Sequence, residues 1–312
     1  MQNTSFVQMS EYLENYQGFP DSDKVGIRNH KFMLRLDNKR LKDIDPWDES
    51  LDDKVKEMIF IESMNNVWYF MREVVRLNVN GELVPFKLNQ SNVAVIWLYE
   101  HNQNVAMFGC RQVTYKSTLL DALYSYELFK TAYRNIDNSV ELFRNYGNAK
   151  FDEFKNILPK YFIDFIIDST AYKSSELADK LSRGNHNTIY GCPISIDRVF
   201  VDDFMYNELA DVAVMCMQDY NKLFIGAGTI GPHNAKYIAE HGVHFRAEMF
   251  DQDIDHFSKM YFEMTGKKPL YSVRVIAHVY LDEDKMKEMC GLLKYDEELI
   301  RKEILCQPAW LM

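Results

Sequence analysis

The chain has 312 residues, of which 47% are apolar, so it can build one large α/β domain or two small ones around a substantial core. Its formal net charge of −10 argues against a generic nucleic-acid coat, although a local basic patch could still contact DNA. The five cysteines are scattered and contain no C-x-x-C pair, which argues against a disulfide framework and a cysteine zinc site. No apolar run is long enough to span a bilayer and the first residues do not form a signal peptide, so we expect a soluble intracellular protein.

The first segment with clear periodicity predicts a helix, a turn and a second helix. Asp52 to Arg76 have apolar residues near helical spacing and predict one helix. The pair Asn80-Gly81 after Val79 predicts a turn that follows a short extended piece. Ser91 is expected to cap a helix that runs to Glu100. Gln90 could pair with an adenine edge through its amide, or it could be an ordinary surface or capping residue.

The next segment has the order of a phosphate-binding loop. Val105–Phe108 predict a buried strand that ends at Gly109, and a helical pattern follows Lys116-Ser117-Thr118. In such a loop, backbone N–H groups and the helix dipole attract phosphate, the lysine contacts the β- and γ-phosphates, and the next hydroxyl ligates Mg²⁺. The alternative is an ordinary buried strand that leads into a helix with a surface lysine.

The spacing of this loop departs from the G-x-x-x-x-G-K-[ST] pattern. Six residues separate Gly109 from Lys116 instead of five, and Tyr115 precedes the lysine in place of glycine. In one alignment a residue is inserted, and Lys116 and Ser117 keep their usual roles. In the other, Thr114, Tyr115 and Lys116 take the positions of the glycine, the lysine and the hydroxyl residue, and the loop would be inactive.

Two later segments predict strands, and the second ends in carboxylates. Phe162–Ile167 predict a buried strand, and Val199–Val201 predict another that ends in Asp202-Asp203. A carboxylate at the end of a buried strand holds Mg²⁺ in nucleotide-hydrolysing sheets, and a second one beside it can activate water. The alternative is a strand that ends in a solvated acidic turn.

A further strand, Lys222–Ile225, leads into a loop of small residues that contains Gly228 and Thr229. Such a loop could detect a γ-phosphate, because glycine lets the backbone approach closely. The alternative is a strand-to-helix turn that needs positive φ. Near the end of the chain, the sequence predicts a strand over Tyr271–Tyr280 and helices over Glu283–Leu292 and Asp296–Leu305.

Histidines and carboxylates between His241 and His256 form a rival cluster that could bind a metal. However, Val243–Phe250 alternate in the manner of a strand, which would place His244 on one face as an ordinary packed or surface residue.

Taken in order, these segments resemble the ATPase domain of the large terminase subunit, the DNA-packaging motor of tailed bacteriophages. The resemblance runs from about residue 66 to the end of the chain, and the order and spacing of the segments together support it. The matching segments are Tyr69–Val75, Phe86–Gln90, Trp97, Cys110–Val113, Ile157–Phe162, Asn187–Gly191, Val199–Asp203, Gly226–Gly231 and Glu298–Glu303.

The resemblance implies an α/β fold, namely a three-layer P-loop NTPase with a mostly parallel central sheet and a small lid subdomain. Residues 1–60 would form the N-terminal part of the lid, residues 61–280 the ATPase core, and helices within residues 281–312 the rest of the lid. The nuclease domain of the family is not among these segments. Either the chain is cut at the domain boundary, or the nuclease is a separate chain.

The resemblance also implies Mg²⁺-dependent ATP hydrolysis. Lys116 would neutralise the β- and γ-phosphates, Arg111 would stabilise transition-state charge, and Asp203 would activate water in place of the family's usual glutamate. Ser117 and Asp202 would hold Mg²⁺, and Gly228 with Thr229 would couple phosphate release to motion. The nucleotide contacts would come from Gln90, Gly109, Arg111, Gln112, Tyr115, Lys116, Ser117 and Thr118.

The implied process is translocation of double-stranded viral DNA into a procapsid by a homo-oligomeric ring. It would take place in the host cytoplasm during infection and would involve no membrane. The implied partners are the portal and the small terminase subunit. Two other hypotheses stay open. Tyr115 could fill the phosphate site, which would leave a non-hydrolysing structural or DNA-docking subunit of viral assembly. Alternatively, the region from His241 to His256 could build a metal-dependent hydrolase.

Overall fold

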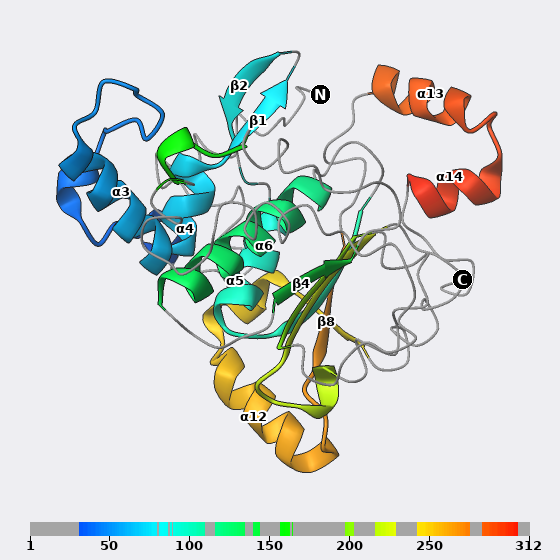
Figure 1. The fold of residues 1–312 in the computed structure, drawn as a ribbon. Helices are drawn as coiled ribbons and strands as arrows, with labels where there is room; N and C mark the ends of the chain where they lie inside the picture. Colours follow the sequence, from blue (N-terminus) through cyan, green and yellow to red (C-terminus); the bar gives the residue numbers. More distant parts are fainter. Residues whose placement is uncertain are drawn as a thin grey trace.

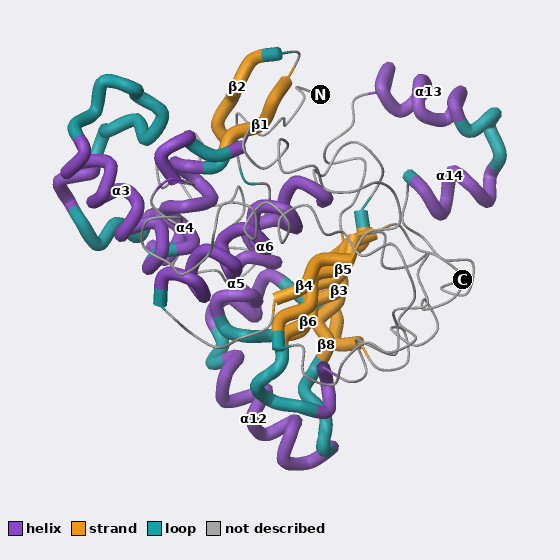
Figure 2. Tube along the Cα trace, in the orientation of Figure 1, coloured by secondary structure: helices purple, strands orange, loops and turns teal. Residues whose placement is uncertain are grey.

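The computed structural model describes residues 31–79, 81–86, 88, 90–109, 116–134, 140–143, 157–162, 164, 197–202, 216–228, 242–274 and 283–304. Their centre is a six-stranded sheet with the strand order β4-β5-β6-β3-β8-β7, in which every pair of neighbours is parallel (Figures 1 and 2). The prediction of an α/β fold with a parallel central sheet is therefore confirmed. The strands are β3 (Asn104–Phe108), β4 (Val140–Phe143), β5 (Arg198–Asp202), β6 (Leu223–Gly228), β7 (Gly242–His244) and β8 (Leu270–Arg274).

The central strands are buried on both faces, as continuous apolar runs in a parallel sheet require. All five residues of β3 and all six of β6 are buried. The predicted strands at Val199–Val201 and Lys222–Ile225 correspond to β5 and β6, and the one at Tyr271–Tyr280 corresponds in its first part to β8.

The strand prediction near His244 is wrong in part. The strand expected over Val243–Phe250 ends at His244, and a short 3₁₀-helix, η4 (Ala247–Asp251), replaces its second half. The reason is aromatic packing, because Phe250 folds back and its ring lies 5.1 Å from that of Phe245 and 5.3 Å from that of Trp97.

The segment that begins at Phe162 was predicted as a strand, but Phe162 and Asp164 are helical. Phe162 is fully buried, and its ring lies 5.5 Å from the ring of Phe60. It therefore packs against the helices rather than in the sheet.

The single helix predicted over Asp52–Arg76 is also wrong, because Asn66 interrupts it with an extended backbone (φ −138°, ψ 95°). The Asn66 side chain accepts a hydrogen bond from the N–H of Tyr69 and so caps the next helix. The elements in this region are η1 (Lys31–Leu34), η2 (Lys39–Leu41), α3 (Asp53–Asn65), α4 (Val67–Tyr69), the π-helical turn η3 (Phe70–Val74), and the antiparallel hairpin of β1 (Arg76–Val79) and β2 (Glu82–Pro85).

The turn predicted at Asn80-Gly81 is confirmed. Val79 pairs with Glu82, so the hairpin has a two-residue loop, and Gly81 has a φ of +90° that disfavours a side chain there.

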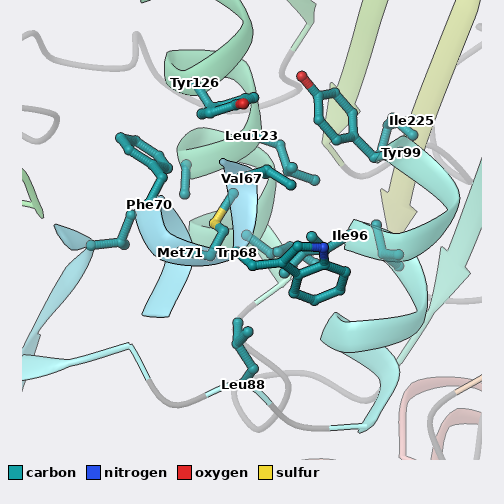
Figure 3. Close-up of a cluster of buried hydrophobic side chains, with 14 of the residues drawn as sticks. Val67, Trp68, Phe70, Met71, Leu88, Ile96, Tyr99, Leu123, Tyr126 and Ile225 are labelled. Carbon is teal, nitrogen blue, oxygen red and sulfur yellow. The ribbon is translucent and has the colours of Figure 1, made fainter. Parts of the chain in front are cut away.

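The helices that cover the sheet share one core with this N-terminal region. They are α5 (Gln90–Glu100) and α6 (Lys116–Tyr133), and Figure 3 shows side chains of α4, η3, α5 and α6 packed together beside Ile225 of β6. Helix α5 begins at Gln90, so Ser91 lies in its first turn and is not the N-cap that the sequence predicted.

Further helices in the described residues are α12 (Ile254–Thr265), α13 (Glu283–Leu292) and α14 (Glu297–Glu303). The last two confirm the helices predicted near the end of the chain, and Asp296 caps α14 by accepting a hydrogen bond from the N–H of Leu299. None of the helices in the described part of the chain is both long and apolar enough to cross a membrane.

The division into a lid and an ATPase core stays a prediction. Among residues 31–60, Met33, Leu41, Ile59 and Phe60 belong to the same apolar core as the sheet and its helices. Helices α13 and α14 lie apart from α3 in Figure 1.

Lys268 is an ionisable group in an apolar setting. Its side chain is fully buried beside the start of β8, and Nζ donates a 2.9 Å hydrogen bond to the carbonyl of Lys222. Nζ also lies 5.6 Å from the centre of the Tyr220 ring. Burial lowers the pKa of Lys268 to about 7, and the nearby charge of Arg198 lowers it further in the same direction.

Stability should therefore rise with pH above neutrality. Between about 7 and the ordinary lysine value of 10.5, the unfolded chain binds the proton that folded Lys268 has lost. The free energy of unfolding should increase by about 1.4 kcal/mol per pH unit in this window. Above pH 10 the trend should reverse, because burial raises the pKa of Tyr271 to about 12 and the unfolded chain then loses protons first. Urea denaturation across this range measures the effect.

In that experiment, Lys268→Met should flatten the rise, whereas Lys259→Met on the exposed face of α12 should keep it. An equal rise in Lys268→Met and in the unchanged chain would contradict the assignment to Lys268.

Candidate functional site

Three central strands end together at the carboxyl-terminal edge of the sheet. In the register of the sheet, Phe108 of β3 pairs with Gly228 of β6, and Asp202 of β5 pairs with Ala227 of β6. The N–H of Gly109, just after β3, donates a 3.2 Å hydrogen bond to the carbonyl of Gly228. The ends of the three strands, which the sequence analysis singled out separately, are therefore neighbours in space.

Helix α6 begins at the same edge, with Lys116 as its first residue. Lys116 Nζ donates a 2.8 Å hydrogen bond to the carbonyl of Gly109, so the ammonium group lies against the end of β3. Ser117 is exposed and Thr118 is half-buried in the first turn. The first turn of a helix presents backbone N–H groups and partial positive charge, both of which attract anions.

Packing of α6 on the sheet fixes this position. Leu119, Leu120 and Leu123 on α6 are almost completely buried, and the helix contacts β4, β5 and β6. The burial of three leucines stabilises this arrangement by several kcal/mol, about 2 kcal/mol for each side chain. The Lys116 end of the helix is thus held at the sheet edge by the apolar face that follows it.

The topology marks the same place as a crevice. From β3 the chain passes through α6 to β4, the outermost strand on one side of the sheet. From β6 it passes to β7, the outermost strand on the opposite side. Connections from these two neighbouring strands leave in opposite directions. In open parallel sheets, ligands bind outside the carboxyl ends of the strands at such a switch point.

Asp202 places a carboxylate at this edge. It is half-buried and is the last residue of β5, with only β6 between its strand and β3. Because neighbouring strands lie about 4.8 Å apart, the backbones of β5 and β3 are separated by about 10 Å. A carboxylate on one side and the hydroxyl of Ser117 on the other are oxygen ligands of the kind that Mg²⁺ accepts. The edge therefore combines a cation, a helix N-terminus and a carboxylate, which together suit a phosphate ester bound with Mg²⁺.

Other predicted site residues are not placed at this edge by the described structure. Arg111, Gln112, Tyr115, Asp203 and Thr229 lie outside the described residues. Gln90, the predicted adenine contact, is the first residue of α5.

Sequence reasoning missed a basic residue at this edge. Arg274, the last residue of β8, pairs in register with Phe108 of β3, on the side of β3 opposite β6. The available signal was a single basic residue in a strand of mostly apolar residues. Only the strand order reveals that this strand is a neighbour of β3.

The rival metal cluster does not gather in the part of the chain that the structure describes. His244 is exposed at the end of β7, and Asp253 accepts a hydrogen bond from the N–H of His256 as the cap of α12. Asp255 lies 2.9 Å from Nδ1 of His101 instead. Within the described residues, no three histidine, cysteine or carboxylate side chains are grouped so that they could hold a metal ion. His241 lies outside these residues.

Comparison of the chain with protein-family models and with curated protein sequences found no match. Support for a function therefore comes from the residues that meet at the edge of β3, β5 and β6, and from the order of the sequence motifs.

Proposed function

We propose that this chain is an Mg²⁺-dependent ATPase of the P-loop class, which acts as the motor domain of a DNA-packaging terminase. The observation that supports this most directly is the position of Lys116. It begins α6 and donates a hydrogen bond to the carbonyl of Gly109. It therefore lies at the edge where β6 ends at Gly228 and β5 ends at Asp202. The contact between Lys116 and the end of β3 supports the alignment with one inserted residue, in which Lys116 and Ser117 keep their usual roles.

Under this proposal, each residue at the edge has one task. Lys116 exchanges its hydrogen bond with Gly109 for the β- and γ-phosphates of ATP, and the first-turn N–H groups of α6 bind the same phosphates. Ser117 and Asp202 hold Mg²⁺, which offsets the charge of the phosphates. Asp203 orients and deprotonates the attacking water, and Arg111 stabilises the charge of the transition state. Gln90 reads the adenine.

The order of the strands supports a coupling role for the end of β6. β6 lies between β3, which leads to the lysine, and β5, which ends in the carboxylate. A change at Gly228-Thr229 would therefore be adjacent to both halves of the nucleotide site. In the proposed motor, this loop transmits phosphate release to the double-stranded DNA, within a ring that docks on the portal of the procapsid and cooperates with the small terminase subunit.

The test is hydrolysis of ATP by the purified chain, measured with and without linear double-stranded DNA. We expect phosphate release that requires Mg²⁺ and that responds to DNA. Asp203→Asn should abolish turnover but leave Mg-ATP binding intact, because the amide cannot act as a base yet keeps the size of the side chain. The exposed Asp284→Asn on α13 is the matched control and should hydrolyse ATP normally.

The outcomes separate the motor from its main competitor. If the chain neither binds nor hydrolyses ATP, the result would favour the non-hydrolysing subunit, in which Tyr115 fills the phosphate site. Full turnover in Asp203→Asn would remove the catalytic role from Asp203 and leave the ATPase assignment itself standing.

A further inference from the structure

A cavity of about 700 Å³ lies outside the central sheet, among η2, α4, η3 and the β1–β2 hairpin. Two of the elements around it, α4 and the hairpin, lie on the same side of the molecule in Figure 1. No lining residue belongs to the six-stranded sheet, so the cavity is separate from the edge at Lys116. Its volume is in the range of sites for small molecules. Its apolar wall consists of Leu36, Leu41, Ile44, Pro46 and Pro85.

Two residues that line this cavity each have a buried hydrogen-bond donor without an acceptor. Tyr69 is 1% exposed, and its hydroxyl has no hydrogen-bond partner among the described residues. The same is true of Nε of Arg76. Buried polar groups are almost always hydrogen-bonded, and an unpaired one costs about 1–3 kcal/mol. Two unpaired donors on one cavity wall therefore indicate a missing acceptor.

The Arg76 guanidinium is held in place by its other contacts. Its Nη2 lies 2.5 Å from Oδ1 of Asp45, and its Cζ lies 5.2 Å from the centre of the Trp47 ring. Asp45 is itself held, because it accepts a 2.9 Å hydrogen bond from the N–H of Trp47. The free Nε–H of Arg76 is thus a pre-positioned donor, and a ligand gains from it without ordering the side chain first.

The charges around the cavity limit the ligand to one negative charge. Three basic side chains line the cavity, namely Lys42, Arg72 and Arg76, and so do three acidic ones, namely Asp43, Asp45 and Glu73. Arg72 is already paired with Glu73 at 2.6 Å, and Arg76 with Asp45. Among the described residues, these two pairs leave Lys42 and Asp43 on the wall without an ion-pair partner. Lys42 can offset one negative charge of a ligand, whereas Asp43 would repel the second charge of a dianionic phosphate. A carboxylate carries one charge and accepts two parallel hydrogen bonds.

We propose that this cavity binds a small monocarboxylate with an apolar body. The carboxylate accepts hydrogen bonds from the Tyr69 hydroxyl and from Arg76 Nε, and the body packs on the leucine, isoleucine and proline wall. This site is independent of the proposed ATPase, because the two share no residue.

Titration calorimetry of the full chain with benzoate and hexanoate tests the site. We expect binding with a dissociation constant below about 1 mM. Tyr69→Phe removes only the hydroxyl and should weaken binding about tenfold, the effect of one hydrogen bond to a charged group. The same substitution should leave the unfolding temperature unchanged or higher, because the hydroxyl has no partner in the free chain. Tyr295→Phe, at an exposed tyrosine next to α13, is the matched control and should bind as the unchanged chain does.

Three comparisons can overturn the proposal. Phenyl phosphate that binds more tightly than benzoate would contradict the limit of one negative charge. Benzoate binding that Tyr69→Phe leaves unchanged, or no binding of either acid at about 10 mM, would remove the site. Displacement of benzoate by Mg-ATP would show that the cavity belongs to a nucleotide site, whereas binding that Lys116→Ala leaves intact would support a separate one.

Discussion

Replacing Lys116 by alanine is expected to lower Mg²⁺-dependent ATP hydrolysis by about a hundredfold to a thousandfold, the usual cost of losing a group that stabilises transition-state charge. The ammonium group lies at the end of β3, 2.8 Å from the carbonyl of Gly109, and α6 begins at this residue. Steady-state phosphate release with saturating ATP measures the loss.

Two further variants make this result specific. Lys116→Gln keeps a polar side chain but removes the charge, so it should lose ATPase activity nearly as fully as Lys116→Ala. Lys160→Ala removes a lysine whose side chain is 92% exposed, and it should hydrolyse ATP normally. Full activity in Lys116→Ala would show that the ungapped alignment or another site is correct.

Replacing Glu127 by alanine is expected to lower the free energy of unfolding by about 3–5 kcal/mol, the cost of removing one partner from a buried ion pair. Glu127 lies on α6 and is 3% exposed. Its carboxylate accepts a hydrogen bond from the Tyr99 hydroxyl and lies 3.3 Å from both Nζ of Lys130 and Nε of Arg198. Without it, the guanidinium on β5 and the buried hydroxyl on α5 lose their shared acceptor.

Chemical denaturation measures this loss, with Glu57→Ala on the exposed face of α3 as the matched control. The control should change stability by less than about 0.5 kcal/mol. The loss of unfolding free energy in Glu127→Gln should lie between those of the two alanine variants, because the amide still accepts a hydrogen bond but carries no charge. A loss in Glu127→Ala no larger than that in Glu57→Ala would mean that the network contributes little.

The two experiments are linked through α6. Glu127 connects this helix to Arg198 at the start of β5, while Lys116 and Asp202 lie at the other ends of the same two elements. A helix that shifts on the sheet after loss of Glu127 would also move the lysine relative to the carboxylate. We therefore expect Glu127→Ala to reduce ATP turnover even at temperatures where the chain remains folded.

Local patterns in the sequence determined the identity of the central strands and of the helices near the end of the chain. Short apolar runs predicted β3, β5 and β6, because a strand buried on both faces needs apolar residues throughout. The turn at Asn80-Gly81 also followed from its own residues.

The tertiary structure alone decided which of these elements are neighbours. The order β4-β5-β6-β3-β8-β7 brings Gly109, Gly228 and Asp202 to one edge, and it places β8 beside β3, whereas the sequence only separates them along the chain. The break at Asn66 likewise depends on distant contacts, since its side chain also donates a hydrogen bond to the carbonyl of Arg35. The unpaired hydroxyl of Tyr69 and the buried amino group of Lys268 have no local signature either. Periodicity reports which face of an element is buried, but strand pairing and side-chain partners are set by long-range packing, so they became visible only in the folded chain.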